Sequence, residues 1–350
     1  MTGTDGMQAG AASRADAVAG EAGRQTVDAT DLRIIAALQR EGRMPFAALA
    51  ERMGVSVYAV TERYRRLAGD GIVHVTPVVN PLAFAGYCQV IVGLRLNGRR
   101  DEAIARLKAM REVTYVVCAL GDADVIAEAV MPSNAAMDRF LKRTLPALPG
   151  LERMQVFSCG RLVLDDHNAG VVARLLRAHG LDPQSCGALA KGEANVGTDV
   201  PVQALDPRLA ETFNALEADG RASYQSVGER LGITHTAARL RIRRLEEAGL
   251  MRIMATVSPM RLGGFRQAFV GLSVRPPHVM DVDALAAIGE VTYVMSGVGL
   301  NGADYLIEMI ADDDVSLWHA VDGSLRTLPG VEQVWWASTV SVEKESYWLG

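Results

Sequence analysis

One stretch of this chain occurs twice, and the repeat limits the folds that the chain can adopt. Residues 54–67 read GVSVYAVTERYRRL, and residues 232–245, which lie 178 positions further on, read GITHTAARLRIRRL. In both copies a hydroxyl residue suited to a helix N-cap follows a glycine, and apolar residues then recur at helical spacing. The sequence therefore predicts two copies of a tight turn followed by a short amphipathic helix.

Opposite the apolar stripe, each helix is predicted to carry two adjacent arginines. With Val60 at the centre of the buried face and about 100° per residue, the first outer face comprises Tyr58, Ala59, Glu62, Arg65 and Arg66. The second comprises Thr236, Ala237, Leu240, Arg243 and Arg244. Such a helix, after another helix and a glycine turn, is typical of a helix-turn-helix that enters a DNA groove. A solvated surface helix is the alternative, but two copies with the same arginine pair favour DNA binding.

Composition places the chain among soluble globular proteins with more than one domain. It has 350 residues, 49% of them hydrophobic, and a net charge of −5. The four cysteines form no CxxC pair and the six histidines show no metal-ligand spacing, so we expect no metal and no cofactor. The first residues lack the pattern of a signal peptide, and no apolar run is long enough for a membrane span. A cytoplasmic protein without a membrane partner is the expectation.

The order of patterns along the chain predicts an α+β fold with two winged helix-turn-helix domains and two ferredoxin-like βαββαβ domains in tandem. Residues 219–221 repeat the pattern of 41–43, and VTYV at 291–294 repeats 113–116 at the same offset of 178. LPG at 328–330 repeats 148–150 two residues later, which predicts a two-residue insertion in the turn at 299–304. The expected segments are a disordered leader (1–26), winged helix-turn-helix 1 (27–80), sensor domain 1 (85–165), a linker (166–204), winged helix-turn-helix 2 (205–258) and sensor domain 2 (264–345).

These motifs, in this order, resemble the Lrp/AsnC (leucine-responsive and asparagine-operon, feast/famine) family of transcription regulators. The resemblance is carried by Asp28 with its Ile/Leu helix, EGR at 41–43, LAERMGVS at 49–56, ERYRRL at 62–67, GDAD at 121–124 and LPG at 148–150. It covers roughly residues 28–165 and 205–345, so the chain looks like two fused subunits.

The resemblance implies a DNA-binding regulator whose ferredoxin-like (RAM-type) domain dimerises and binds a small effector, usually an amino acid, near the Gly-Asp-x-Asp turn. It points to Gly121, Asp122 and Asp124 in the first copy and to Gly299 and Asp304 in the second, where the turn carries the two-residue insertion. Glycine lets backbone amides approach a carboxylate, and aspartate can pair with an α-ammonium. The alternative is a tight β-turn in which these residues serve the backbone alone.

On double-stranded DNA, we expect the two sensor domains to pair within the chain as a pseudo-dimer that further associates into a homo-oligomer. The arginine pairs are assigned chiefly to phosphates, Glu62 to a cytosine amino group and Leu240 to a thymine methyl. Because the outer faces differ, the two half-sites should not be identical. The predicted DNA-binding residues also include Ser56, Arg63, Thr234 and Arg241.

Three other functions fit the sequence less well. Residues 297–302 fit GxGxxG, but a strand rather than a helix is predicted to follow, which argues against a dinucleotide site. Sirohaem decarboxylases resemble the same fused module and rely on His and Tyr residues around the sensor turn, whereas residues 113–120 contain no histidine. A metabolite-binding protein without DNA binding is hard to reconcile with the four outer arginines. The sequence therefore predicts a regulator and not an enzyme, with no catalytic residue, and leaves the effector, the operator and the sign of regulation open.

Overall fold

The computed structural model describes residues 27–350 with the exception of 199, 348 and 350. The leader expected at residues 1–26 lies outside the described residues. No helix in the described part of the chain is long and apolar enough to cross a membrane.

Each half of the chain begins with three short helices and a single strand. The first set is α2 (Ala29–Arg40), α3 (Phe46–Met53), α4 (Val57–Gly69) and β1 (Val73–Val78), and the second is α8 (Pro207–Leu216), α9 (Tyr224–Leu231), α10 (His235–Glu247) and β6 (Arg252–Val257). Gly54 and Gly232 have left-handed φ angles of 67° and 64°, so each ends one helix and turns the chain into the next. Ser56 then caps α4 and Thr234 caps α10, each accepting a hydrogen bond from a backbone N–H three residues on.

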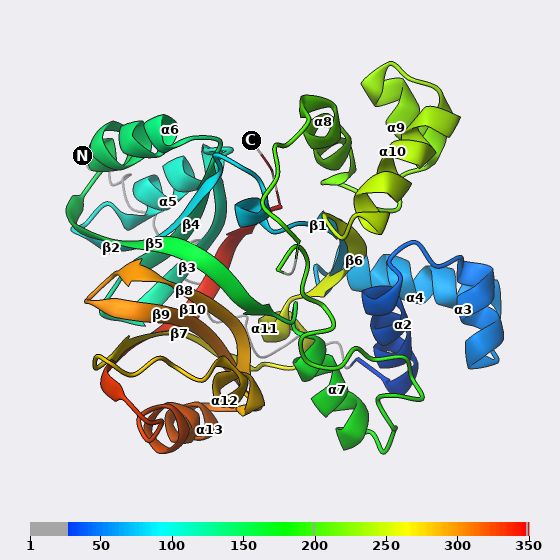
Figure 1. The fold of residues 1–350 in the computed structure, drawn as a ribbon. Helices are drawn as coiled ribbons and strands as arrows, with labels where there is room; N and C mark the ends of the chain where they lie inside the picture. The colour runs from blue at the N-terminus through cyan, green and yellow to red at the C-terminus, as the bar shows by residue number, and fades with distance from the viewer. Residues whose placement is uncertain (1–26, 199, 348, 350) are drawn as a thin grey trace, which may run out of the picture.

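The two strands leave their helices and pair with each other. β1 runs antiparallel to β6, with Val73 opposite Val257 and Val78 opposite Arg252. Each of these strands thus leaves its own helices to pair with the equivalent strand of the other half. This two-stranded ribbon lies between the helix-turn-helix units and the larger sheet (Figure 1).

Two arginines hold the helix-turn-helix units together in a reciprocal way. The Arg43 guanidinium donates to the carbonyl oxygens of Gly220 (2.6 Å) and Ala222 (2.8 Å) in the other unit. Arg221, at the equivalent position, donates to Gly42 O (2.5 Å) and Met44 O (3.0 Å). The repeated Gly-Arg motif at 42–43 and 220–221 therefore forms an exchange of arginines across the pseudo-two-fold axis.

The remaining strands confirm the βαββαβ order in both halves. The first half contains β2 (Cys88–Leu96), α5 (Arg100–Ala109), β3 (Val113–Gly121), β4 (Val125–Met131), α6 (Asn134–Arg139) and β5 (Leu151–Asp165). After the short α11 (Pro259–Leu262), the second contains β7 (Arg266–Val274), α12 (Val282–Ala287), β8 (Val291–Gly299), β9 (Ala303–Ala311), α13 (Asp314–His319) and β10 (Val331–Glu345).

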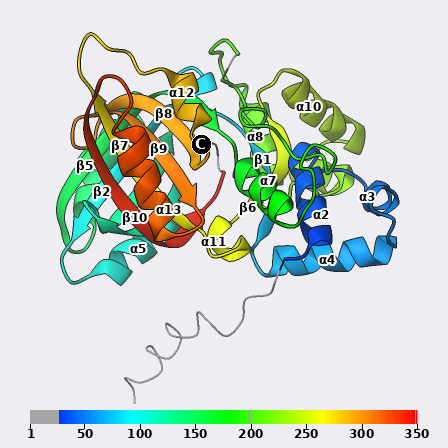
Figure 2. The same cartoon turned by 90° about the horizontal axis from the view of Figure 1, so that it is seen from below.

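The two sheets close on each other to form one barrel, in the strand order β10-β3-β4-β2-β5-β8-β9-β7. Two 15-residue strands make this closure: β5 pairs with β2 and then with β8, while β10 pairs with β7 and then with β3. Buried side chains such as Ile91, Phe157 and Phe269 fill the space between the sheets. The barrel forms one end of the molecule and the helix-turn-helix units form the other (Figures 1 and 2).

The segment at 166–204 contains a helix and packs along the body of the protein. α7 (Ala169–Ala178) buries Val172 and Leu176 in the same apolar cluster as α2. The Arg40 guanidinium of α2 donates to the carbonyl oxygens of Gly187 (3.0 Å) and Ala188 (3.2 Å). The chain between the two halves is thus tied to the first helix-turn-helix unit.

Candidate DNA interface and effector sites

The outer face of α4 lies where the sequence predicts it. Val60 and Leu67 are fully buried, whereas Tyr58 exposes 76% of its surface. Arg65 is exposed and forms an ion pair with Glu62 on the same helix. Glu62 and Ala59 are partly exposed, and Ser56 is exposed and serves as the cap.

Two predicted DNA-binding arginines of α4 are instead held by an acidic pair at the start of α2. Asp31 is only 1% exposed, and its carboxylate accepts from Arg63 (2.8 Å) and Arg66 (2.5 Å). Arg63 also contacts the carboxylate of Asp28 at 2.6 Å. The side-chain hydrogen bond to Asp31 raises the pKa of Arg63. Arg63 and Arg66 thus join α4 to α2, and a phosphate would have to compete with Asp31 for Arg66.

The corresponding arginines of α10 have a different environment. Leu209 occupies the position equivalent to Asp31, so the acidic pair has no second copy. Arg243 is exposed and pairs with Glu247 at 2.6 Å, and Arg244 is exposed. Of the other predicted residues, Leu240 (47%), Thr234 and Thr236 are exposed, and Ala237 and Arg241 are partly exposed. The two predicted recognition helices, α4 and α10, therefore differ in the residues on their outer faces. They also differ in that Asp31 holds Arg66 of α4, whereas Arg244 of α10 is exposed.

The first predicted effector turn, between β3 and β4, is built around an ion-pair cluster. Asp124 accepts from Arg95 (3.3 Å), from Arg100 (3.0 Å) and from the backbone N–H of Leu96 (2.8 Å). Asp122 is exposed. Gly121 has a φ of 124°, and a Cβ there would lie 2.8 Å from the carbonyl oxygen of Trp336. The glycine thus lets β10 approach, and the Asp124 carboxylate stabilises the turn.

In the second predicted effector turn, between β8 and β9, a glycine again allows a neighbouring strand to approach, but the residues at the tip differ. Gly299 has a φ of 126°, and a Cβ there would lie 2.0 Å from the carbonyl oxygen of Val156. Asp304 is partly exposed and accepts from the backbone N–H of Val274 at 2.8 Å. At the tip of this longer turn, Leu300 is buried in the barrel core. The longer turn therefore contributes an apolar side chain to packing.

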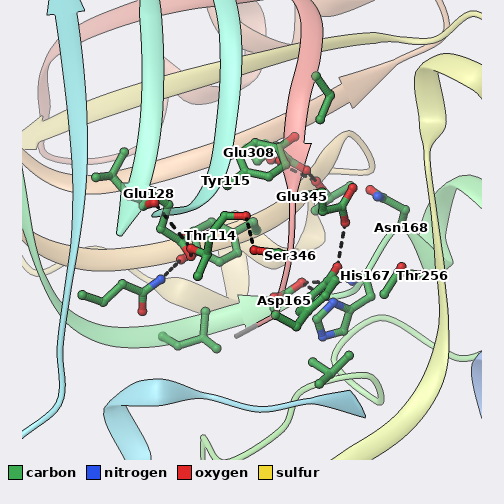
Figure 3. Close-up of a pocket in the computed structure, with 18 of the residues that line it drawn as sticks. Thr114, Tyr115, Glu128, Asp165, His167, Asn168, Thr256, Glu308, Glu345 and Ser346 are labelled. Carbon is green, nitrogen blue, oxygen red and sulfur yellow. Dashed lines mark hydrogen bonds and ion pairs between the residues drawn. The ribbon is translucent and has the colours of Figure 1, made fainter. Parts of the chain in front are cut away.

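A pocket of about 160 Å³ lies between the two sheets, at the end of the barrel that faces β1 and β6. Its polar lining comes in pairs that the duplication relates: Gln89 and Gln267, Thr114 and Thr292, Tyr115 and Tyr293, Glu128 and Glu308, Asp165 and Glu345. Figure 3 labels both members of the last two pairs. It shares no lining residue with either turn. Among the described residues that line it, none is a lysine or an arginine.

The four carboxyl groups of this pocket all have raised pKa values. Burial raises the pKa of Glu308 to about 8 and that of Asp165 to about 7, and it also raises the pKa of Glu128 and Glu345. Burial lowers the pKa of His167 to about 4, although its Nδ1 lies 3.2 Å from Asp165. These buried acids therefore keep their protons to a higher pH than exposed carboxyl groups do, and the pocket gains negative charge as pH rises.

Comparison with known proteins decides the family. The leucine-responsive regulatory protein of Escherichia coli is 30% identical over 139 residues, which are 37% of this chain and 83% of that protein. The chain belongs to the Lrp/AsnC family. Within this Lrp/AsnC chain, the AsnC-type helix-turn-helix domain matches residues 27–68 and 213–246, and the Lrp/AsnC ligand binding domain matches residues 89–166. It is thus an Lrp/AsnC-type transcriptional regulator with a ligand-binding domain and two helix-turn-helix units.

Two further similarities describe the range of relatives of this Lrp/AsnC chain. An uncharacterized HTH-type transcriptional regulator of Pyrococcus horikoshii is 26% identical over 142 residues, covering 40% of this chain and 95% of that one. The structure of the siroheme decarboxylase NirDL aligns with a TM-score of 0.57 at 12% identity, covering 91% of this chain and 93% of that one. The second similarity shows that the arrangement of the whole chain is shared, and at this identity it shows the fold alone.

Sequence reasoning did not find the pocket of this Lrp/AsnC chain. Glu128 and Glu308 lie within the apolar strands β4 and β9, at equivalent positions of the repeat. A glutamate kept among apolar neighbours at the equivalent position of both strands was the available signal. The sequence could not show that the two strands face one cavity.

Proposed function

We propose that the chain binds double-stranded DNA sequence-specifically as an intrachain pseudo-dimer that reads two unlike half-sites. The observation that carries this proposal is that the two helix-turn-helix units, each with an exposed recognition helix (α4 or α10), are joined through the reciprocal Arg43 and Arg221 contacts. The pairing of β1 with β6 supports it, because a ribbon shared by both units restrains their relative position. Half-sites should then have a fixed spacing.

The contacts assign different roles to the arginines of the two helices. Arg65, Arg243 and Arg244 are exposed and suit phosphate contacts, whereas Arg66 is held by Asp31. Glu62 on α4 suits a cytosine amino group and Leu240 on α10 suits a thymine methyl. The second unit should therefore contribute more to the salt-dependent part of binding.

An anisotropy titration with labelled DNA from upstream of the gene tests this assignment. Arg243→Ala and Arg244→Ala should each weaken binding to all sequences and reduce the slope of log K against log salt by about 1. Arg177→Ala, on α7 and distant in sequence from either recognition helix, is the matched control. Loss of discrimination between sites with an unchanged salt slope would assign these arginines to bases instead.

The effector of this regulator is proposed to be an amino acid bound at the β3–β4 turn. Arg100 and Asp124 offer opposite charges 3.0 Å apart, and a zwitterion inserted between them would pair its carboxylate with one and its ammonium with the other. Exposed Asp122 lies in the same turn. One amino acid should change the DNA affinity of the wild type about tenfold, which corresponds to about 1.4 kcal/mol of coupling, and should lose this effect in Asp122→Asn.

Association beyond the pseudo-dimer is part of the same proposal. Leu120 and Val298 occupy equivalent positions beside the two turns, and they expose 65% and 64% of their surface. Apolar side chains at such positions suit contacts between copies of the chain. Light scattering should give a mass that is a multiple of 37.5 kDa, and Leu120→Ser with Val298→Ser should reduce it.

A decarboxylase is the second candidate, because NirDL shares the arrangement of the whole chain and the pocket brings His167 close to tyrosines. The lining argues against it: a sirohaem carries several carboxylates, and burying them among four acids without a lysine or arginine is unfavourable. Addition of sirohaem to the purified chain should leave its absorption spectrum unchanged. A shifted Soret band with loss of CO₂ from the added tetrapyrrole would establish the enzyme.

A further inference from the structure

The pocket between the two sheets contains two nearly equivalent polar clusters, one from each half of the chain. In the first cluster, Thr114 donates to Glu128 (2.8 Å) and the Gln89 amide lies 3.4 Å from the Tyr293 hydroxyl. In the second, Thr292 donates to Glu308 (2.9 Å), and the Gln267 amide donates to Glu308 (2.7 Å) and to the Tyr115 hydroxyl (3.0 Å). Each cluster thus combines a carboxylate, an amide and a tyrosine contributed by the other half.

Both clusters keep an unused hydrogen-bond acceptor. The Oε1 atoms of Gln89 and Gln267 have no hydrogen-bond partner within the described structure, although these residues are only 5% and 3% exposed. Asn168 Oδ1, on the same pocket, is also buried without a partner. Buried amide oxygens are ordinarily satisfied, so three such acceptors around one cavity point to a ligand that donates hydrogen bonds.

The carboxylates around the same cavity favour a ligand that is positively charged as well as able to donate hydrogen bonds. Glu128 and Glu308 belong to the two clusters, and Asp165 and Glu345 line the same cavity at the ends of the long strands β5 and β10. Figure 3 shows all four carboxylates around one space. The walls between them include Ile91, Ile126 and Phe269, which suit methylene groups.

We propose that this pocket binds a small aliphatic diamine, with one ammonium group at each cluster and the methylene chain along the apolar wall. Each ammonium donates up to three hydrogen bonds, which matches a carboxylate together with the unused amide oxygen beside it. The duplicated lining matches a ligand with two similar ends. This site is separate from the DNA interface and from the effector turns, so the proposal does not rest on the proposed function.

Other ligand classes fit this lining less well. An amino acid would place its own carboxylate among four acids, which is unfavourable without a nearby cation. A metal ion is not favoured, because no group of three His, Cys, Asp or Glu side chains within the described residues is arranged to hold one.

Binding of a diamine should release protons from the protein. Near pH 7 the pKa of Glu308 at about 8 and that of Asp165 at about 7 leave these acids partly protonated, and pairing with an ammonium requires them to ionise. Affinity should therefore rise with pH up to about 8, by about tenfold per pH unit for each proton released. The other titratable groups on the pocket are Tyr115, Glu128, His167, Tyr293, Glu345 and Tyr347, and Cys159, His74 and Arg252 act on them from outside the lining.

Isothermal titration of the full chain with 1,4-diaminobutane and 1,5-diaminopentane tests the proposal. The matched probes are butylamine, which has one ammonium group, and 1,4-butanediol, which has none. We expect the diamines to bind at least tenfold more tightly than butylamine, butanediol not to bind, and affinity to increase from pH 6 to pH 8. Titration in two buffers of different ionisation enthalpy should show proton release.

Variants locate the site. Glu128→Gln and Glu308→Gln, made separately, should each weaken diamine binding at least tenfold, and circular dichroism checks that each variant folds. Glu152→Gln, an exposed glutamate on β5, is the matched control and should bind as the wild type does. Absence of diamine binding by the wild type, equal binding of butylamine, or an affinity that falls as pH rises would overturn the proposal. So would undiminished binding by both pocket variants.

Discussion

Replacement of Arg221 by alanine should weaken the contact between the two helix-turn-helix units. The Arg221 guanidinium is half-buried at their contact, donates to Gly42 O and Met44 O, and lies 4.3 Å from the ring centre of Phe46. Burial lowers the pKa of Arg221, so part of the favourable contact energy offsets the desolvation of its charge. Arg43 makes the reciprocal contacts and remains in the variant.

The magnitude follows from these contacts. Two hydrogen bonds from a charged donor contribute about 1.5 kcal/mol each at the low end of the usual range, and a guanidinium over an aromatic ring adds about 0.5–1 kcal/mol. Relief of the desolvation penalty reduces the total. We therefore expect Arg221→Ala to lower the free energy of unfolding by ~2–3 kcal/mol. Arg221→Lys should recover less than half, because an ammonium cannot reproduce the two-pronged geometry.

Urea denaturation followed by circular dichroism measures this change, with Arg208→Ala as the control. Arg208 is exposed on α8, and its loss should change stability by less than about 0.5 kcal/mol. Arg221→Ala should also weaken binding to DNA with two half-sites more than binding to a single half-site, because one of the contacts that restrain the spacing of α4 and α10 is lost. A variant within about 0.5 kcal/mol of the wild type, with unchanged preference for paired half-sites, would refute this account of the contact.

Three further predictions concern Asp31, Glu308 and Gly121. Asp31→Ala leaves Arg63 and Arg66 without their shared anion and should lower the free energy of unfolding by about 2 kcal/mol. The loss is smaller than for a fully buried ion pair because the two arginines are one-third exposed. Urea denaturation measures this loss, and a change below about 0.5 kcal/mol would contradict the prediction. For Glu308 the folded pKa of about 8 lies above the ordinary 4.5, so its contribution to stability is present at low pH and is lost as pH rises towards 8. Glu308→Gln should therefore gain stability relative to the wild type across this range in thermal scans, and a constant difference would contradict the assignment. Gly121→Ala should lower the melting temperature more than Gly302→Ala, because the added Cβ meets the Trp336 carbonyl oxygen at 2.8 Å in the first case and no atom within 4 Å in the second; equal effects would argue against this close approach.

Local features of this fold are the part that the sequence predicts well. The N-caps at Ser56 and Thr234, the glycine turns and the apolar stripes depend on residues within one helical turn of each other, and all are present. The βαββαβ order follows from alternation within short strands. Repetition at a fixed offset strengthened both inferences, because each pattern was observed twice.

The sequence could not predict the contacts between segments that lie far apart along the chain. Strand β5 extends to Asp165 because its second half pairs with β8 of the other half of the chain, from Phe157 opposite Gly299 to Asp165 opposite Tyr293. The arginines of α4 and α10 look equivalent in sequence, and only the fold shows that Asp31 holds Arg66. Leu209 at the position equivalent to Asp31 leaves the second unit without this pair.

For the candidate sites too, the sequence indicates what depends on a single helix and not what depends on contacts between distant segments. Tyr58 and Leu240 were placed on outer faces from helical periodicity, and both are exposed. The Asp124 carboxylate was expected to face an effector, whereas its hydrogen bonds to Arg95, Arg100 and a backbone amide depend on two other segments, β2 and α5. Pairing of residues across the barrel, which creates the acidic pocket, leaves no local signal beyond the isolated acids.

Selection of binding sites from a random DNA library tests the central claim most directly, that one chain reads two unlike half-sites. The wild type should select paired half-sites of different sequence at a fixed spacing. The double variant Tyr58→Thr with Glu62→Leu gives α4 the residues that α10 carries at the equivalent positions, and it should select half-sites that resemble each other more closely. Selection of a symmetric palindrome by the wild type, or of no sequence at all, would contradict the account.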